Sequence, residues 1–153
     1  MSDLPFDITD ELRGKLHALG WSEDRRVDIS ASLAKATAAG WQIFPLARAV
    51  IEQFDGIGQW SDYMFDVEDV SNNWTYRGDG QEVPDFETFE KVCAQKIYPM
   101  AEFNGWSPIL MTDKGLLVQF VGEQAHWLGS TPQEAFEALF SRMYRCRTDK
   151  EFP

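Results

Sequence analysis

The sequence contains little histidine and cysteine, with two of each in 153 residues. Cys93 and Cys146 lie far apart in the chain and have no metal-like spacing, which argues against a disulfide framework and predicts two reduced thiols. Zinc generally needs three or four converging ligands, and His17 and His126 are isolated from each other in the sequence. We therefore predict no metal site and no other cofactor.

Long apolar runs are also missing, since no stretch approaches the roughly 18 residues that span a bilayer. The first residues, Met1-Ser2-Asp3-Leu4-Pro5-Phe6-Asp7, are acidic where a secretory signal would be basic and then apolar. We therefore expect a cytoplasmic protein with no membrane partner. The length is typical of one domain, and there is no internal repeat or low-complexity linker, so we expect a single domain over residues 1–153.

Familiar catalytic motifs are absent from the sequence. It has no glycine-rich phosphate loop, no Gly-x-Ser-x-Gly elbow and no His-Glu-x-x-His zinc helix. We therefore expect a protein that is not an enzyme. One alternative from this class remains, a hydrolase that uses mid-chain carboxylates as general acid and base.

Positive charge is scarce in the middle of the chain. The formal net charge is −11, and residues 55–92 hold ten acidic residues against only Arg77 and Lys91. Such a field repels nucleic acid and anionic membranes and attracts basic protein surfaces. We therefore expect a basic protein partner and no nucleic-acid partner. A surface that only keeps the protein soluble is the alternative interpretation.

Aromatic residues are mixed into this acidic segment. Tyr and Trp are enriched among the residues that dominate interface energies, and acidic neighbours speed encounter with a basic partner. The alternation of ring and polar residues from Trp60 to Val67 also fits a strand, so we expect many of these rings to lie in the core. The predicted binding surface consists of Asp62, Asp66, Glu68, Asp69, Trp74, Tyr76, Asp79 and Glu82.

Helices are predicted near residues 10–19, 30–39, 45–54 and 85–95, and again from Pro132. Gly20 and Gly40 follow the first two, where glycine suits the left-handed residue that ends a helix. Thr131 and Glu134 are typical of a capping box at the last helix. Strands are predicted near 62–67, 73–77, 109–112 and 116–121, the last two joined by a hairpin turn at Asp113-Lys114-Gly115. This order predicts an α+β fold, with helices packed on one face of a mainly antiparallel sheet.

Several short motifs carry a family resemblance. The first is the connector Gly20-Trp21-Ser22-Glu23-Asp24-Arg25-Arg26-Val27-Asp28. Arg25 and Arg26 lie beside three acidic residues there, which predicts local ion pairs that fix a corner between helices. Later motifs are Phe54-Asp55-Gly56-Ile57-Gly58, then Tyr98-Pro99-Met100-Ala101-Glu102, and Leu128-Gly129 before the last helix.

In this order the motifs resemble the SUKH superfamily, specifically its third immunity subgroup, over residues 9–141. Ala101 stands where that group usually carries glycine, and the likeness is weakest between about 60 and 95. The resemblance implies a SUKH-like fold in which the signature residues are structural. Those residues are Gly20, Trp21, Arg25, Arg26, Val27, Asp28, Tyr98, Pro99 and Glu102.

The resemblance also implies an immunity protein of a polymorphic toxin system, of the kind used in contact-dependent competition, which binds a cognate bacterial toxin without chemistry of its own. The charge distribution adds a mechanism, in which the acidic face occludes the active site of a basic, nuclease-type toxin. The alternative within the superfamily is an interaction or regulatory module with no toxin partner. The sequence leaves the oligomeric state open.

Overall fold

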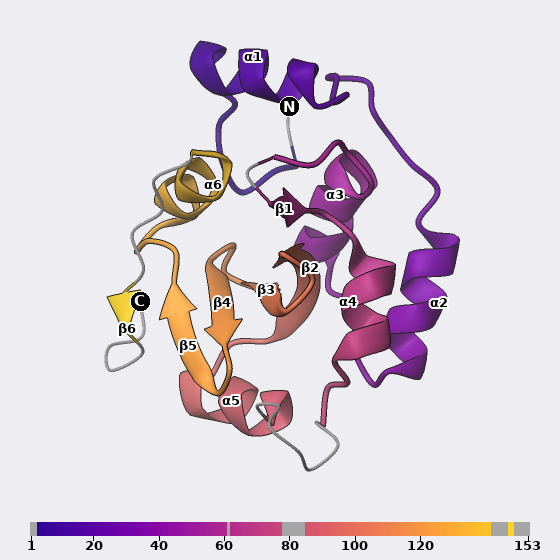
Figure 1. Cartoon of the computed structure of the whole chain (residues 1–153), viewed down its shortest axis with the longest axis vertical. Coiled ribbons are helices and arrows are strands. Elements are labelled where there is room, and N and C mark those ends of the chain that lie inside the picture. Colours follow the sequence, from indigo (N-terminus) through magenta and orange to yellow (C-terminus); the bar gives the residue numbers. More distant parts are fainter. Residues whose placement is uncertain (1–2, 61, 78–84, 142–146, 149–153) are drawn as a thin grey trace.

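The computed structural model describes residues 3–60, 62–77, 85–141 and 147–148 (Figure 1). Helices in these residues are α1 (Asp10–Ala18), α2 (Ser30–Ala38), α3 (Pro45–Phe54), α4 (Val67–Asn73), α5 (Phe86–Cys93) and α6 (Pro132–Phe140). Strands are β1 (Tyr63–Met64), β2 (Ile97–Phe103), β3 (Ser107–Thr112), β4 (Leu117–Val121), β5 (Gln124–Trp127) and β6 (Arg147–Thr148). The strands form one antiparallel sheet in chain order, which confirms the predicted α+β class.

The first two helices end as the glycines predict. Gly20 has φ +98° and Gly40 has φ +95°, and each is followed by a tryptophan whose N–H donates to a carbonyl five residues back, on Leu16 and Ala36. These are the left-handed stops that let the chain fold back over the last turn. Both Trp21 and Trp41 are buried, so each stop directs a large ring into the core.

The hairpin between β3 and β4 is also confirmed. Ile109 pairs with Gln119 and Met111 with Leu117, while Gly115 takes φ +82° in the turn. At the last helix, the Thr131 hydroxyl accepts from the Glu134 N–H at 3.2 Å, and Glu134 accepts from the Ser130 N–H at 2.9 Å. The predicted capping therefore forms, with the glutamate reaching Ser130.

Residues 62–77 differ from the prediction of two strands. Only Tyr63–Met64 is a strand, and α4 follows it, so the strand predicted near 73–77 is wrong. Asp66 begins the helix because its carboxylate accepts the Asp69 N–H at 2.9 Å. After α4, the Trp74 carbonyl accepts from Trp41 Nε1 at 3.2 Å, which ties this segment to α2 and prevents pairing with the sheet.

The strands β2 and β3 are buried at successive positions. Every residue of β3 and the first six residues of β2 are buried. Successive strand residues point to opposite faces, so both faces are covered. The register puts Tyr98 and Phe120 on opposite sides; Phe44 at the start of α3 contacts Tyr98, and Phe86 of α5 contacts Phe120. Helices thus extend beyond the one face predicted.

Two further arrangements matter for the site. α4 packs against α2 and β2. Figure 1 shows β1, the edge strand beside β2, in the upper half of the view and α5 at the lower end of the sheet. None of the helices in the described part of the chain has the length and hydropathy that a membrane span requires.

Candidate functional site

The first turn of α4 gathers three of the predicted acidic residues. Asp66 is the N-cap, and Glu68 and Asp69 follow in the first turn, where negative charge complements the helix dipole. All three side chains are half-buried. Asp66 uses one oxygen to cap the helix, so its second oxygen is available to other donors.

The β2–β3 turn lies beside this helix end. Asn104 and Gly105 both have positive φ, and the Asn104 N–H donates to the Asp62 carbonyl at 2.8 Å. Trp106 follows with 53% of its surface exposed, and its ring meets Phe103 edge-on with the ring centroids 6.0 Å apart. The turn thus presents a large aromatic ring and the exposed Asp62 at the same end of the sheet.

Glu102, the last but one residue of β2, lies beneath these groups. Its side chain is only 3% exposed, and its Oε2 receives no hydrogen bond from any described residue. It lies within hydrogen-bonding reach of the Asp69 carboxyl, and a Cβ at Gly105 would stand 4.0 Å from its Oε1. The strand and the turn therefore hold this carboxyl between them.

The environment of Glu102 disfavours its charge. Burial contributes most, and the hydrogen bond with Asp69 and the negative charges of Asp69 and Asp66 add to it, which together raise the pKa of Glu102 to about 8. Two carboxylates contain no hydrogen to share, so the contact with Asp69 requires a proton. Near neutral pH Glu102 is therefore mostly protonated and able to donate to Asp69.

We call Asp62, Asp66, Asp69, Glu102 and Trp106 the turn cluster. The described residues form six ion pairs, and none of them involves an acid of this cluster or Glu68. The charges at this end of α4 are therefore uncompensated within the described part of the chain.

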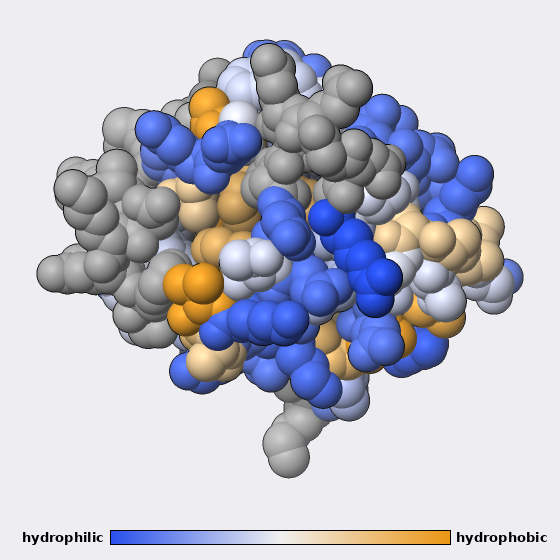
Figure 2. Space-filling model, turned by 90° about the horizontal axis from the view of Figure 1, so that it is seen from below, coloured by the Kyte–Doolittle hydropathy of each residue, from blue (hydrophilic) through white to orange (hydrophobic). Residues whose placement is uncertain are grey.

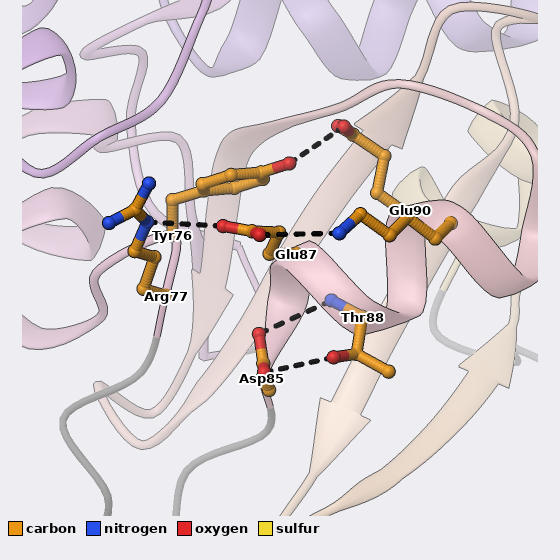
Figure 3. Close-up of polar contacts among 7 residues, drawn as sticks. Tyr76, Arg77, Asp85, Glu87, Thr88 and Glu90 are labelled. Atoms are coloured by element: carbon orange, nitrogen blue, oxygen red, sulfur yellow. Dashed lines mark hydrogen bonds and ion pairs between the residues drawn. The ribbon is translucent and has the colours of Figure 1, made fainter.

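Acids at the other end of α4 have partners (Figure 3). The Tyr76 hydroxyl donates to Glu90 Oε1 at 2.8 Å, and the Ile97 N–H donates to Glu90 Oε2 at 3.1 Å. Glu87 pairs with Arg77 at 3.1 Å and with Lys91 at 3.4 Å. We call Tyr76, Arg77, Glu87, Glu90 and Lys91 the α5 cluster.

Two pKa shifts accompany these contacts. Burial, followed by the hydrogen bond to Glu90, raises the pKa of Tyr76 to about 12. The Asp85 carboxylate accepts from the Thr88 hydroxyl and N–H as the N-cap of α5, which holds the pKa of Asp85 below its usual range. Seen from below, hydrophilic residues cover the centre of this face (Figure 2). The acids here are already used by the fold.

The predicted binding residues therefore divide. Asp62, Asp66, Glu68 and Asp69 gather around the first turn of α4. Trp74 is only 9% exposed and packs in the core, and the Tyr76 hydroxyl donates to Glu90. Asp79 and Glu82 lie outside the described residues. The remaining rings of the segment also turn inward: Tyr63, Phe65 and Phe86 are buried, and Trp60 and Phe89 pack against the core.

Sequence reasoning missed the contribution of two residues. The family resemblance implies only a structural role for Glu102, as part of the motif that begins at Tyr98. The place of Glu102 at the end of an apolar run is the only signal in the sequence that it lies in a buried strand. Trp106 follows Asn104-Gly105, a pair typical of tight hairpin turns, which is a signal for an exposed ring at a turn. The structure brings Glu102 to Asp66 and Asp69, and it places Trp106 in the turn whose Asn104 N–H donates to the Asp62 carbonyl.

The motif that begins at Gly20 has a structural role, but its arginines make hydrogen bonds to backbone carbonyls instead of the predicted ion pairs. Arg25 donates to the backbone carbonyls of Gln53 and Asp55 and thereby clamps the end of α3, and burial lowers its pKa. Arg26 donates to the Arg25 carbonyl. The predicted local ion pairs are replaced by these bonds, while Glu23 pairs with Arg13.

Other signature residues also serve the fold. The Val27 N–H donates to the Glu52 carbonyl at 2.8 Å, and Asp28 accepts from the Ser30 N–H and hydroxyl, which lowers the pKa of Asp28. Tyr98 and Pro99 are buried in β2. Asp55, counted in the acidic segment, points inward to the Ser32 hydroxyl and the Val67 N–H, and burial raises its pKa.

Two cavities lie away from the turn cluster. The larger, about 820 Å³, lies between α1 and α6, and the smaller, about 500 Å³, is lined by residues of the α2 end, by Tyr76 and by Glu90. No group of three or more potential metal ligands converges in the part of the chain that the structure describes. The Glu102–Asp69 pair could in principle act as general acid and base, but it lines neither cavity, and Glu102 Oε2 is not accessible to a substrate.

Comparison with known proteins gave one match. A family model described as SUKH-3 immunity protein matches residues 8–142. Searches of curated proteins and of solved structures found no match. The matched segment contains every residue of the turn cluster.

Proposed function

Because the chain belongs to the SUKH-3 immunity protein family, we propose that it neutralises a cognate bacterial toxin by docking the turn cluster and Glu68 on a basic surface of that toxin. The observation that carries this proposal is the set of carboxylates around the first turn of α4 that lack an ion-pair partner among the described residues, near the β2–β3 turn that exposes Trp106. An exposed aromatic ring on a surface with charge of one sign combines a contact residue with electrostatic steering.

The toxin class follows from charge complementarity. Nucleases bind phosphates with lysine and arginine, so their active sites offer the basic surface that an acidic face fits. Occlusion of that site needs no chemistry from the immunity protein, in keeping with a family that is generally non-enzymatic. Self-protection leaves no free toxin, which calls for a dissociation constant of about 1 nM and a fast, salt-sensitive association.

The test is co-expression with the cognate toxin, identified by affinity capture from the native host, together with the association rate measured against salt. Asp62→Asn and Glu68→Gln are expected to slow association, most strongly at low salt. Trp106→Ala is expected to raise the dissociation constant by about 30-fold, since loss of a dominant contact residue costs about 2 kcal/mol or more. Both effects should reduce the growth of cells that carry the toxin.

Glu123→Gln is the matched control, because it removes the same charge from an exposed residue in the β4–β5 turn. Protection and association equal to the control for all three variants would contradict the proposed surface. Unrelieved toxicity in the presence of the native protein would favour the interaction-module alternative. Turnover of nucleic-acid, glycan or peptide substrates that is abolished by Asp69→Asn would favour the hydrolase alternative.

A further inference from the structure

Glu102 is a buried acid that faces other acids, and no described residue donates a hydrogen bond to its Oε2. On α4 the groups that act on it are Asp69 and Asp66, which are both acidic. Its neighbours in the sheet are Met64 of β1 and Pro108 of β3, which cannot ionise. No charge on these packed elements compensates a Glu102 carboxylate, and burial of an unpaired charge is costly.

Helix capping explains only part of this arrangement. Asp66 and Asp69 stand where acids stabilise the first turn of a helix, so their positions alone indicate no ligand. Glu102 comes from a different element, and 97% burial beneath two acids opposes stability as soon as it ionises. A buried polar atom without a partner in a native protein calls for an explanation, and a ligand that brings donors is one.

We propose that Asp66, Asp69 and Glu102 form a binding site for one arginine side chain of the toxin, an inference that rests on the proposed function. A guanidinium offers five N–H donors and no acceptor, the complement of a site that contains only acceptors. Its planar fork suits carboxylates that approach from more than one direction better than an ammonium does. The half-buried Asp66 and Asp69 make the first contacts, and Glu102 supports them from below.

The arginine takes the place of the proton that Glu102 shares with Asp69. On binding, the guanidinium N–H groups donate to Asp66 and Asp69, and its positive charge stabilises the Glu102 carboxylate beneath them, so the Glu102 O–H bond breaks and the proton passes to solvent. The unbound protein must lose this proton when arginine binds, so the affinity for arginine rises with pH, by up to about tenfold per pH unit. The rise ends above the pH at which the unbound protein has already lost the proton. A purely Coulombic contact with ionised surface acids lacks this dependence.

The experiment uses tri-arginine amide as the probe and follows the side-chain carboxyl carbons of the ¹³C-labelled full chain by NMR. In the free protein the Glu102 resonance is expected to titrate at about 8. Tri-arginine should move this midpoint down by about one pH unit or more. Tri-citrulline amide, which has the same shape without the charge, should leave it unchanged, and tri-lysine amide should act more weakly than tri-arginine.

Two variants complete the test. Glu102→Gln keeps the shape of the side chain and should make tri-arginine affinity nearly independent of pH between 6 and 8. Asp69→Asn, at a half-exposed position, should weaken binding about tenfold or more, while Glu123→Gln should bind as the native protein does. A Glu102 midpoint indifferent to tri-arginine at every concentration reached, or a native pH dependence in Glu102→Gln, would overturn the proposal.

These outcomes are separable from those of the toxin assay. Tri-arginine binding with proton release, combined with full protection by Asp62→Asn, Glu68→Gln and Trp106→Ala, would leave the arginine site standing while the proposed docking surface fails. If those variants lose protection but tri-arginine does not shift the Glu102 titration, the proposed docking surface stands and the arginine site fails.

Discussion

Acidic residues lie near both ends of α4 in contrasting environments, although the helix is only about 10 Å long at 1.5 Å per residue. Beyond its C-terminal end, Glu90 of α5 accepts from Tyr76 and from the Ile97 backbone, and Glu87 of α5 meets two cations. At its N-terminal end, Asp66 and Asp69 meet another acid, Glu102. Acidic residues from the same segment of the sequence therefore stabilise the fold near the C-terminal end of α4, while those near its N-terminal end repel one another and destabilise it.

This difference shows why net charge alone does not locate a binding surface. An acid whose lone pairs are filled by internal donors has little to offer a partner, and separating it from those donors costs stability. An acid that lacks internal donors gains from a partner that supplies them. The turn cluster is the part of the acidic segment with this property.

The largest expected effect concerns the rings of the two regions. Trp74→Ala removes a buried side chain at the C-terminal end of α4 and should lower the free energy of unfolding by about 3–5 kcal/mol. Trp106→Ala removes an exposed ring at the turn cluster and should change it by less than about 0.5 kcal/mol. Urea unfolding of both variants measures the contrast, and equal losses would mean that Trp106 is a structural residue.

The second effect is a pH dependence that only the turn cluster produces. The pKa of Glu102 rises from 4.5 to about 8 on folding, so the native state holds a proton that the unfolded chain has released between these values. Stability from this group is complete below pH 4.5 and is lost as pH rises through 8, with a slope of at most about 1.4 kcal/mol per unit.

Glu102→Gln stays neutral at every pH, so it isolates this contribution. Its free energy of unfolding should match that of the native protein near pH 4.5 and exceed it by up to about 5 kcal/mol above pH 8. Asp28 and Asp85 have lowered pKa values and lose stability in the opposite direction, as pH falls, but they contribute equally to both proteins. A pH-independent difference between the two unfolding curves would show that Glu102 carries no proton in the native state.

The third effect is a loss at the α5 cluster. Glu90→Ala leaves the Ile97 N–H and the Tyr76 hydroxyl without their acceptor, which should cost about 1–3 kcal/mol in urea unfolding. It should also lower the pKa of Tyr76 from about 12, because a hydrogen bond and a negative charge that hold the phenol neutral disappear. An unchanged Tyr76 titration would mean that burial alone sets its pKa, and tri-arginine affinity should stay the same in this variant.

Much of the helical half of the fold follows from local sequence rules. Gly20, Gly40 and Thr131 act through their own backbone or through neighbours within four residues, so their roles are readable without a structure. The β3–β4 hairpin is similar, because Gly115 sits between two apolar runs. Strand β2 is not predicted from the sequence, because it contains a proline and an irregular register between Pro99 and Ala101. Its continuous buried run also lacks the alternation of apolar and polar residues that is typical of a strand.

The candidate site was only partly readable for a different reason. Asp62, Asp66, Glu68 and Asp69 stand out by charge, but whether each acid is compensated depends on residues distant in the chain, such as Ile97 for Glu90. Glu102 is separated from Asp69 by 33 positions, and burial of an acid follows no periodic rule. The alternation around Tyr63 indicated a strand, and the cap at Asp66 determined the helix that followed it instead.

The smallest expected effect is the sharpest test of which end docks. Arg77 is 84% exposed, and Arg77→Ala should change stability by less than about 1 kcal/mol, because an exposed ion pair contributes little. The substitution nevertheless frees part of Glu87 and makes the α5 face more negative. If the toxin approached this face, association at low salt would become faster. Docking at the turn cluster predicts an association rate within twofold of the native value, and stopped-flow mixing with the toxin at two salt concentrations distinguishes the outcomes. A marked acceleration would move the binding surface to the opposite end of α4.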